Sequence, residues 1–136
     1  MSAVPPEQTF DLLVPVLPGD VDELGHVNNT VYLRWAQDVA TAHWQSLASV
    51  ESQAAILWVV VRHEIDYKAP ALPGDGVLLR TWVGKATRIT FERHTLIVHA
   101  TRNQLLAQAR TLWCPTSKKT GKPHRVSGEV RAQFST

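Results

Sequence analysis

The residues best suited to chemistry gather in one short stretch, which runs from Gly19 to Tyr32. It reads Gly-Asp-Val-Asp-Glu-Leu-Gly-His-Val-Asn-Asn-Thr-Val-Tyr and combines carboxylates, a histidine and two neighbouring amide side chains. The only long helical pattern of the chain begins directly behind it. Free backbone N–H groups at a helix N-terminus stabilise negative charge, so the stretch is suited to reactions in which negative charge develops.

The helix that must position this loop is predicted from Asn29 to about Ala48. Apolar side chains recur there with a helical period, and polar ones fall on the opposite side. Asn28 or Asn29 is a suitable N-cap, because its side-chain oxygen can accept a bond from a free backbone N–H. The broad apolar stripe indicates a helix that lies against a sheet. The stripe consists of Val31, Trp35, Val39 and His43, with Tyr32, Ala36, Ala40 and Leu47 beside them.

The rest of the chain has the patterns of strands joined by turns. In Ile89–Thr101, for example, Ile89, Phe91, Arg93, Thr95, Ile97 and His99 share one face. An antiparallel sheet with one apolar face needs a cover, and the single long helix supplies it. The sequence therefore predicts an α+β fold. The expected strands are Phe10–Leu17, Ile56–Lys68, Val77–Val83, Ile89–Thr101 and Leu105–Cys114, and a short helix is expected within Ser127–Phe134.

Length and composition are typical of one globular domain, so residues 1–136 are expected to form a single unit with 1–6 frayed. A net charge of +2 without a dense basic run argues against nucleic acid as a partner. The longest apolar run, 54–61, is shorter than the roughly 20 residues that span a bilayer, so no membrane association is expected. No signal-peptide pattern opens the sequence, and the expected location is the cytoplasm. Five tryptophans suggest association into an oligomer.

The chain resembles the hotdog-fold acyl-CoA thioesterases, in particular the 4-hydroxybenzoyl-CoA thioesterase-like group. The resemblance rests on Asp22-x-x-Gly25-His26-Val27-Asn28-Asn29-x-x-Tyr32. A second motif, Tyr67-x-x-Pro70-x-x-x-Gly74-Asp75, and the late turn Gly121-Lys122-Pro123 support it. The similarity covers about residues 8 to 135.

This resemblance implies an antiparallel sheet wrapped around one long central helix. It implies a homodimer or homotetramer with active sites between protomers, acyl thioesters of coenzyme A as substrates, and no metal or other cofactor. The His-Val-Asn-Asn version of the loop resembles members that act on fatty rather than aromatic acyl groups, so a fatty acyl-CoA is expected here.

The resemblance also assigns the reacting groups. Asp22 matches the catalytic carboxylate, which acts either as a general base on water or as a nucleophile; the sequence leaves both mechanisms open. The backbone N–H of Asn29 matches the group that holds the oxyanion. Without the resemblance, the sequence favours Asp22 as a turn or capping carboxylate.

The remaining candidates have structural alternatives. His26 either contacts the thioester or orients Asp22, or it serves only the helix entry. Asn28 caps the helix or touches substrate, and Tyr32 packs on the buried side or borders the substrate. Lys85 and Arg88 are candidates for the phosphates of coenzyme A, or are ordinary surface charges.

Two other functions are considered. A hotdog enoyl-CoA hydratase would use Asp20 and His26 as an acid–base pair, but the Asn-Pro of that family's loop is absent here. A non-catalytic protein that binds acyl-CoA or another small ligand in the same groove has no need of an acid beside the helix start. A third arrangement, with a carboxylate in the middle of the helix, has Asp38 as its nearest candidate.

Overall fold

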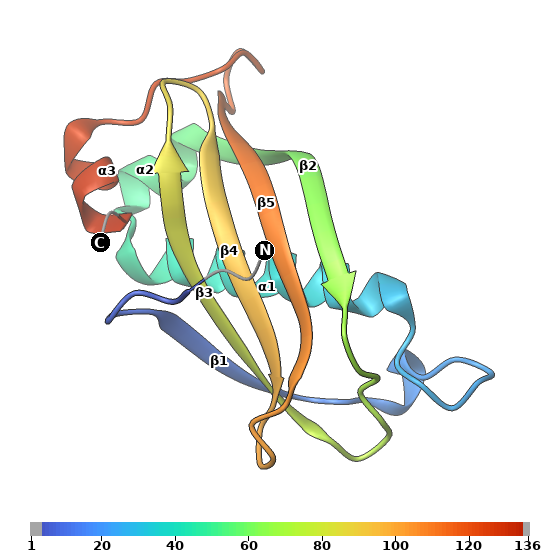
Figure 1. The fold of residues 1–136 in the computed structure, drawn as a ribbon. Helices are drawn as coiled ribbons and strands as arrows, with labels where there is room; N and C mark the ends of the chain where they lie inside the picture. The colour runs from blue at the N-terminus through green and yellow to red at the C-terminus, as the bar shows by residue number, and fades with distance from the viewer. Residues whose placement is uncertain (1–3, 135–136) are drawn as a thin grey trace.

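Five antiparallel strands form one sheet in the order β1-β3-β4-β5-β2, as Figure 1 shows. The computed structural model describes residues 4–134. The strands are β1 (Phe10–Pro15), β2 (Ile56–Tyr67), β3 (Gly76–Ala86), β4 (Phe91–His99) and β5 (Leu105–Ser117). The helices are η1 (Pro18–Asp20), α1 (Asn29–Leu47), α2 (Val50–Ala55) and α3 (Gly128–Phe134).

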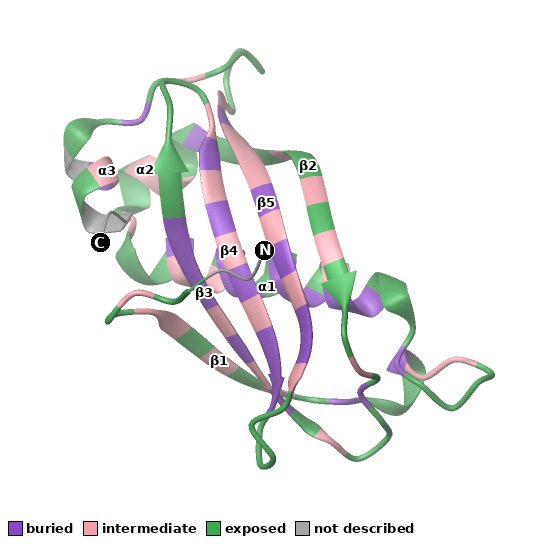
Figure 2. Cartoon of the chain, viewed as in Figure 1, coloured by how far each residue is buried: buried purple, intermediate pink, exposed green. Residues whose placement is uncertain are grey.

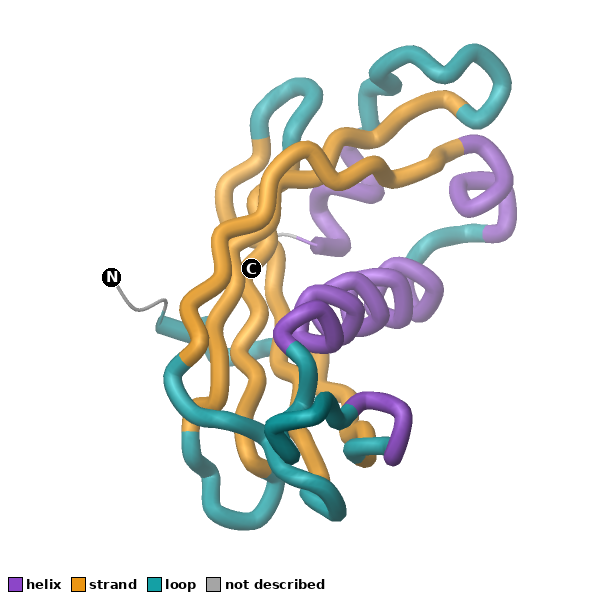
Figure 3. Tube along the Cα trace, turned by 90° about the vertical axis from the view of Figure 1, so that its right-hand side faces the viewer, coloured by secondary structure: helices purple, strands orange, loops and turns teal. Residues whose placement is uncertain are grey.

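The long helix α1 lies against the concave face of the sheet, which curves around it (Figure 3). The buried face of α1 differs from the predicted stripe at three positions: Trp44 is buried, His43 is half-buried and Leu47 is exposed. The other six residues of the stripe are buried, with Trp35 and Val39 almost fully enclosed. They pack on a core that includes Leu79, Ile97 and Leu106 from the sheet. The α+β prediction of an antiparallel sheet wrapped around one central helix is confirmed.

Alternation along the strands decides which side chains meet the helix. In β4 the residues Phe91, Arg93, Thr95 and Ile97 are buried, and the residues between them are half-buried, a pattern visible in Figure 2. The sequence predicted that these residues share a face, and the structure shows that this face is the one turned toward α1. It includes a charged residue, Arg93.

The element boundaries differ from the predictions where local hydrogen bonds intervene. The first strand ends at Pro15, because the short turn η1 follows. Leu17 is the N-cap of η1, and its N–H donates to the carboxylate of Asp20, the last residue of η1. The helix α2 was not predicted. It starts at the N-cap Ser49, and none of its residues is buried, so it has no apolar stripe for a sequence pattern to reveal.

The ends of the chain add little regular structure to the fold. Residues 4–6 form no helix or strand, and the other positions expected to be frayed, 1–3, lie outside the described residues. The short C-terminal helix is present as α3. Among the described helices, none has the length and apolar character needed to cross a lipid bilayer.

Candidate active site

The loop before α1, residues 21–27, is closed at its base, and its tip protrudes from the molecule (Figure 1). Val21 and Val27 pair as an isolated antiparallel bridge. Just above them the Asp22 N–H donates to the His26 carbonyl at 2.9 Å, and the Gly25 N–H donates to the Asp22 carbonyl at 3.0 Å. Gly25 has a φ of +78°, a conformation that a residue without Cβ adopts readily. The loop extends outward from the start of α1 (Figure 1).

Asp22 lies at the base of this loop and is half-buried. Its Oδ1 accepts the Leu24 N–H at 2.9 Å, a local turn contact. Its Oδ2 has no hydrogen-bond partner within residues 4–134. One oxygen therefore fixes the side chain while the other is open to a reactant. His26 is exposed on the same loop.

Asp20, two residues earlier, occupies a different environment. Its side chain is 4% exposed, its Oδ2 accepts the Leu17 N–H at 2.9 Å, and its Oδ1 accepts from Arg34 Nη2 at 3.0 Å. Its backbone carbonyl also accepts the Asn28 N–H at 2.8 Å. Asp20 thus joins the turn, the helix start and the helix surface, and both of its carboxylate oxygens are engaged.

The helix start has the N-cap that the sequence predicted as one alternative. Asn28 Oδ1 accepts the Thr30 backbone N–H at 2.9 Å and the Thr30 hydroxyl at 2.7 Å. Asn29 is the first helical residue, and no acceptor within the described residues takes its backbone N–H. That N–H is one of the groups that a helix cannot satisfy internally. It is available to a ligand oxygen.

The second sequence motif packs against this helix start. The Tyr67 hydroxyl donates to the Asn29 carbonyl at 3.1 Å, and the Val27 N–H donates to the Ala71 carbonyl at 3.0 Å. Tyr32 is buried beneath them, and its hydroxyl oxygen accepts the Ala71 N–H at 2.9 Å. Burial raises the pKa of Tyr32, so its hydroxyl stays protonated at neutral pH. Tyr67 was not among the predicted site residues, although it opens the second motif.

Lys85 and Arg88 lie elsewhere. They sit at the end of β3 and in the connection to β4, and both are exposed. This end of β3 is near α2 and α3, at the opposite end of α1 from the Asp22 loop (Figure 1). Within one chain the structure therefore does not bring these two cations together with Asp22.

A cavity in the described part of the chain is also separate from the Asp22 loop. It lies between the C-terminal half of α1 and the sheet, and it contains Arg93 and several aromatic rings. Sequence analysis did not identify it. The available signal was Arg93, the one arginine among the alternating residues that β4 turns toward the helix.

No group of three or more His, Cys, Asp or Glu side chains in the described part of the chain is arranged to hold a metal ion.

Comparison with protein families gives one match over most of the chain: the model of the Thioesterase-like superfamily covers residues 16–134. Among curated proteins, a chloroplastic acyl-[acyl-carrier-protein] hydrolase of Cuphea viscosissima is 28% identical over 79 residues. That match covers 58% of this chain and 19% of the Cuphea protein. The chain thus spans about a fifth of the length of the curated relatives that it matches.

Two solved structures are similar along nearly their whole length. A thioesterase from Thermus thermophilus, complexed with coenzyme A and Zn, is 25% identical with a TM-score of 0.78. The match covers 91% of this chain and 90% of that one. A 1,4-dihydroxy-2-naphthoyl-CoA thioesterase from Synechocystis is 24% identical with a TM-score of 0.81. The match covers 93% of this chain and 96% of the Synechocystis chain. At this identity it supports the fold alone.

Proposed function

Since this chain belongs to the thioesterase-like superfamily, we propose that it hydrolyses an acyl thioester of coenzyme A to the free acid and the thiol. One observation carries the proposal. Asp22 has one carboxylate oxygen without a protein partner, in a loop that leads directly to the open backbone N–H of Asn29. The Thermus relative, titled a thioesterase in complex with coenzyme A, supports the choice of carrier. The loop's resemblance to members acting on aliphatic substrates supports a fatty acyl group.

In the proposed reaction Asp22 takes a proton from water as the water oxygen attacks the thioester carbonyl carbon. Alternatively, the carboxylate itself attacks, and water then cleaves the resulting anhydride. The Asn29 N–H stabilises the oxyanion; the C–S bond then breaks, and the leaving thiolate is protonated. His26 orients Asp22 or contacts the thioester oxygen. Asn28 and Tyr32 frame the helix start against which the acyl carbonyl rests.

The proposal includes a second copy of the chain. The edge strand β2 is 12 residues long, and no strand within residues 4–134 pairs with it on one side, whereas the other edge strand, β1, has six residues and ends in Pro15. A long free edge is a template for pairing with another strand. Pairing two copies along β2 would complete a cleft beside each Asp22 loop. Lys85 and Arg88 are then proposed to bind the phosphates of coenzyme A across the interface.

Replacement of Asp22 tests the function directly. Asp22→Asn keeps the shape of the side chain and an acceptor for the Leu24 N–H, but removes the base. We expect the release of free thiol from acyl-CoA to fall by about 10²–10⁴-fold, with the fold retained. Asp38→Asn, on the exposed side of α1, is the matched control and should keep its activity. Equal turnover by the native and Asp22→Asn proteins would remove Asp22 from its role.

A hydratase would need Asp20 free to act with His26, yet both oxygens of Asp20 accept hydrogen bonds from protein groups. We therefore expect no hydration of crotonyl-CoA. Asp20→Asn should lower the free energy of unfolding by about 1–3 kcal/mol, while thiol release changes much less than in Asp22→Asn. Saturable binding of acyl-CoA without turnover of any acyl-CoA tested would favour the alternative of a non-catalytic binding protein.

The carrier and the chain length need a substrate panel, because the curated relatives are named as acyl-carrier-protein hydrolases. Acyl-CoAs of graded length, an aromatic acyl-CoA and one acyl-carrier-protein substrate should be compared at equal concentration. We expect aliphatic acyl-CoAs to be turned over fastest. A clear preference for the carrier-protein substrate would keep the hydrolase assignment and change its carrier.

A further inference from the structure

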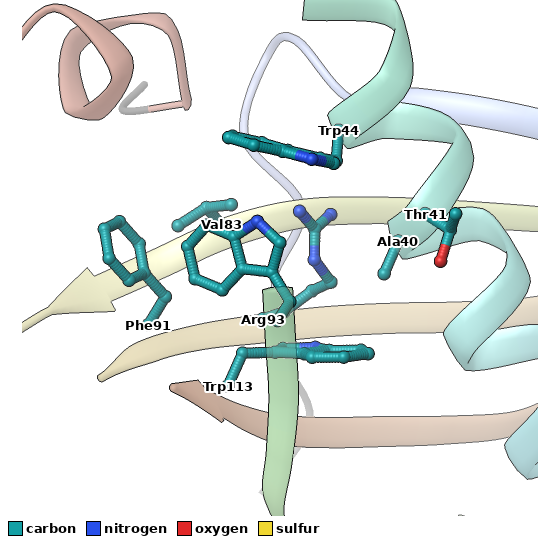
Figure 4. Close-up of a pocket in the computed structure, with 8 residues that line it drawn as sticks. Ala40, Thr41, Trp44, Val83, Phe91, Arg93 and Trp113 are labelled. Atoms are coloured by element: carbon teal, nitrogen blue, oxygen red, sulfur yellow. The ribbon is translucent and has the colours of Figure 1, made fainter. Parts of the chain in front are cut away.

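The cavity beside the C-terminal half of α1 has aromatic walls and a charged group inside. Its total empty space, which includes open solvent at the mouth, is about 450 Å³. Trp44, Trp58, Phe91 and Trp113 supply rings from α1, β2, β4 and β5 (Figure 4). The Trp58 ring lies edge-to-face with those of Trp44 and Phe91, at centroid distances of 5.4 and 5.0 Å. The rings thus hold one another in place and make flat apolar walls.

Arg93 extends into this cavity from β4 (Figure 4). The residue is only 7% exposed, and no carboxylate within the described chain pairs with it. Its protein contacts, to His43 Nδ1 at 3.0 Å and Thr81 Oγ1 at 3.1 Å, both use Nη1. The N–H groups of Nη2 and Nε therefore have no protein acceptor among those residues. Burial lowers the pKa of Arg93 to about 10, which leaves the guanidinium charged at neutral pH.

Two further donors in the same cavity wall lack partners. The indole Nε1 atoms of Trp58 and Trp113 are buried, and neither has an acceptor within the described residues. A buried donor without an acceptor is costly, and native proteins rarely leave one unexplained. Here two such donors and an unpaired buried cation line one apolar cavity. The two indole N–H groups require a hydrogen-bond acceptor, and the guanidinium favours one that carries negative charge.

We propose that this cavity binds an apolar ligand through a carboxylate, which Arg93 holds as an ion pair and the indole N–H groups of Trp58 and Trp113 complete. A guanidinium and a carboxylate match in geometry and form strong charge-assisted hydrogen bonds. The aromatic walls accommodate an alkyl or aryl body. An uncharged chain end in the same place would leave the cation and both indole donors desolvated and unpaired.

The carboxylate could belong to a free acid or to the far end of an acyl group whose near end is a thioester. Binding of the free acid does not rest on the proposed function, since it requires no hydrolysis. Binding of an acyl group does rest on the proposed function. It makes the substrate class more specific, namely acyl thioesters that carry a carboxylate at the far end of the acyl chain.

The test is isothermal titration calorimetry of the intact protein with octanoate and with octanamide, which differ in charge but hardly in shape. We expect octanoate to bind about tenfold or more tightly than octanamide. Arg93→Gln should abolish this difference. Arg110→Gln, an arginine on the neighbouring strand β5 that pairs with Glu92 outside the cavity, is the matched control and should keep it.

A second variant covers the case in which Arg93→Gln fails to fold. Trp58→Phe keeps an aromatic wall and removes one indole N–H. It should therefore lower the affinity for octanoate several-fold and leave the affinity for octanamide unchanged. Equal affinities of octanoate and octanamide for the native protein, or no octanoate binding up to millimolar concentration, would overturn the proposal.

Hydrolysis then identifies the source of the carboxylate. If the ligand is an acyl group, the coenzyme A monothioester of suberic acid should be preferred over octanoyl-CoA, and Arg93→Gln should lose the preference through KM. If octanoate binds with the expected selectivity but the two thioesters are hydrolysed equally, the ligand is a free carboxylic acid. If octanoate binds and neither thioester is hydrolysed, the proposed function fails and the carboxylate site stands.

Discussion

Two aspartates separated by one residue show how environment assigns different tasks to the same side chain. Asp20 is enclosed, and its charge is matched by Arg34 and by the Leu17 N–H. Asp22 makes a single turn contact and keeps one oxygen open. A carboxylate whose lone pairs are all engaged stabilises a fold, whereas one with an open oxygen can accept a proton from a reactant. The proposed chemistry accordingly lies with Asp22.

His43 and Arg93 form a second contrast, in which a neutral base lies beside a buried cation. Burial, with a smaller contribution from the Arg93 charge, lowers the pKa of His43 from 6.5 to about 4. Its ring stacks on Phe10 at 5.0 Å and contacts Arg93 Nη1 through Nδ1. A protonated imidazole there would meet the guanidinium at close range, so the folded chain holds His43 neutral.

This pKa shift predicts a pH dependence of stability. As the pH falls from about 6.5 towards about 4, the unfolded chain binds a proton at His43 that the folded chain does not bind. The free energy of unfolding should therefore decrease across this window. His63, whose pKa burial also lowers, contributes in the same direction. Urea unfolding at a series of pH values measures the slope.

His43→Gln should make that slope shallower, because glutamine can still accept from Arg93 but does not titrate. The exposed His26 provides the control, and His26→Gln should leave the slope close to that of the native protein. An unchanged slope in His43→Gln would contradict the assignment of this pH dependence to His43.

At the scale of elements, α1 serves the core and the candidate site at once. Its buried stripe fixes the helix against the sheet, and its first turn presents the Asn29 N–H next to the Asp22 loop. The Asn28 cap defines where the helix begins, and the Tyr67 hydroxyl ties the Asn29 carbonyl to the end of β2. The position of the Asn29 N–H is therefore set by packing along the whole helix.

Removal of the cap should weaken this arrangement. Asn28→Ala removes the acceptor for the Thr30 N–H and should lower the free energy of unfolding by about 1 kcal/mol. Asn28→Asp restores an acceptor and should restore most of that stability. Both are measured by urea unfolding.

The same pair of variants separates capping from substrate binding. If Asn28 only caps the helix, Asn28→Asp should also restore the native KM of thioester hydrolysis. Native stability combined with a raised KM in Asn28→Asp would instead assign Asn28 a contact with substrate.

At the scale of the whole molecule, the two edges of the sheet differ in what they offer a partner. The β2 edge is long and carries the exposed apolar residues Leu57, Val59 and Val61. The β1 edge is half as long and ends in a proline, which has no N–H to donate to a neighbouring strand. The proposed pairing of two copies uses the β2 edge.

A charge on each edge tests this assignment. Val59→Lys places a lysine on the proposed interface of both copies and should shift the protein from dimer to monomer, because burying unpaired charge is costly. Leu13→Lys makes the same change at an exposed position of β1 and should leave the dimer intact. Size-exclusion chromatography with light scattering measures the mass of each. Dissociation by Leu13→Lys alone would place the interface on the opposite edge.

The sequence by itself determined the features that depend on local periodicity and local hydrogen bonding. The stripe from Val31 to Leu47 predicted α1, and alternation from Ile89 to Thr101 predicted β4 and which of its residues share a face. The cap at Asn28 followed from its side chain and its place before the stripe. These predictions succeed because each signal lies within a few residues of the structure that it specifies.

Only the tertiary structure decided which distant residues meet. It separated Asp20 from Asp22 by giving Asp20 a partner on α1, and it left Lys85 and Arg88 at the far end of α1 from the loop. It also brought Arg93 together with rings from four different elements. Partnership and burial depend on how helix and sheet pack across tens of residues of sequence separation, and local patterns contain no information about such long-range contacts.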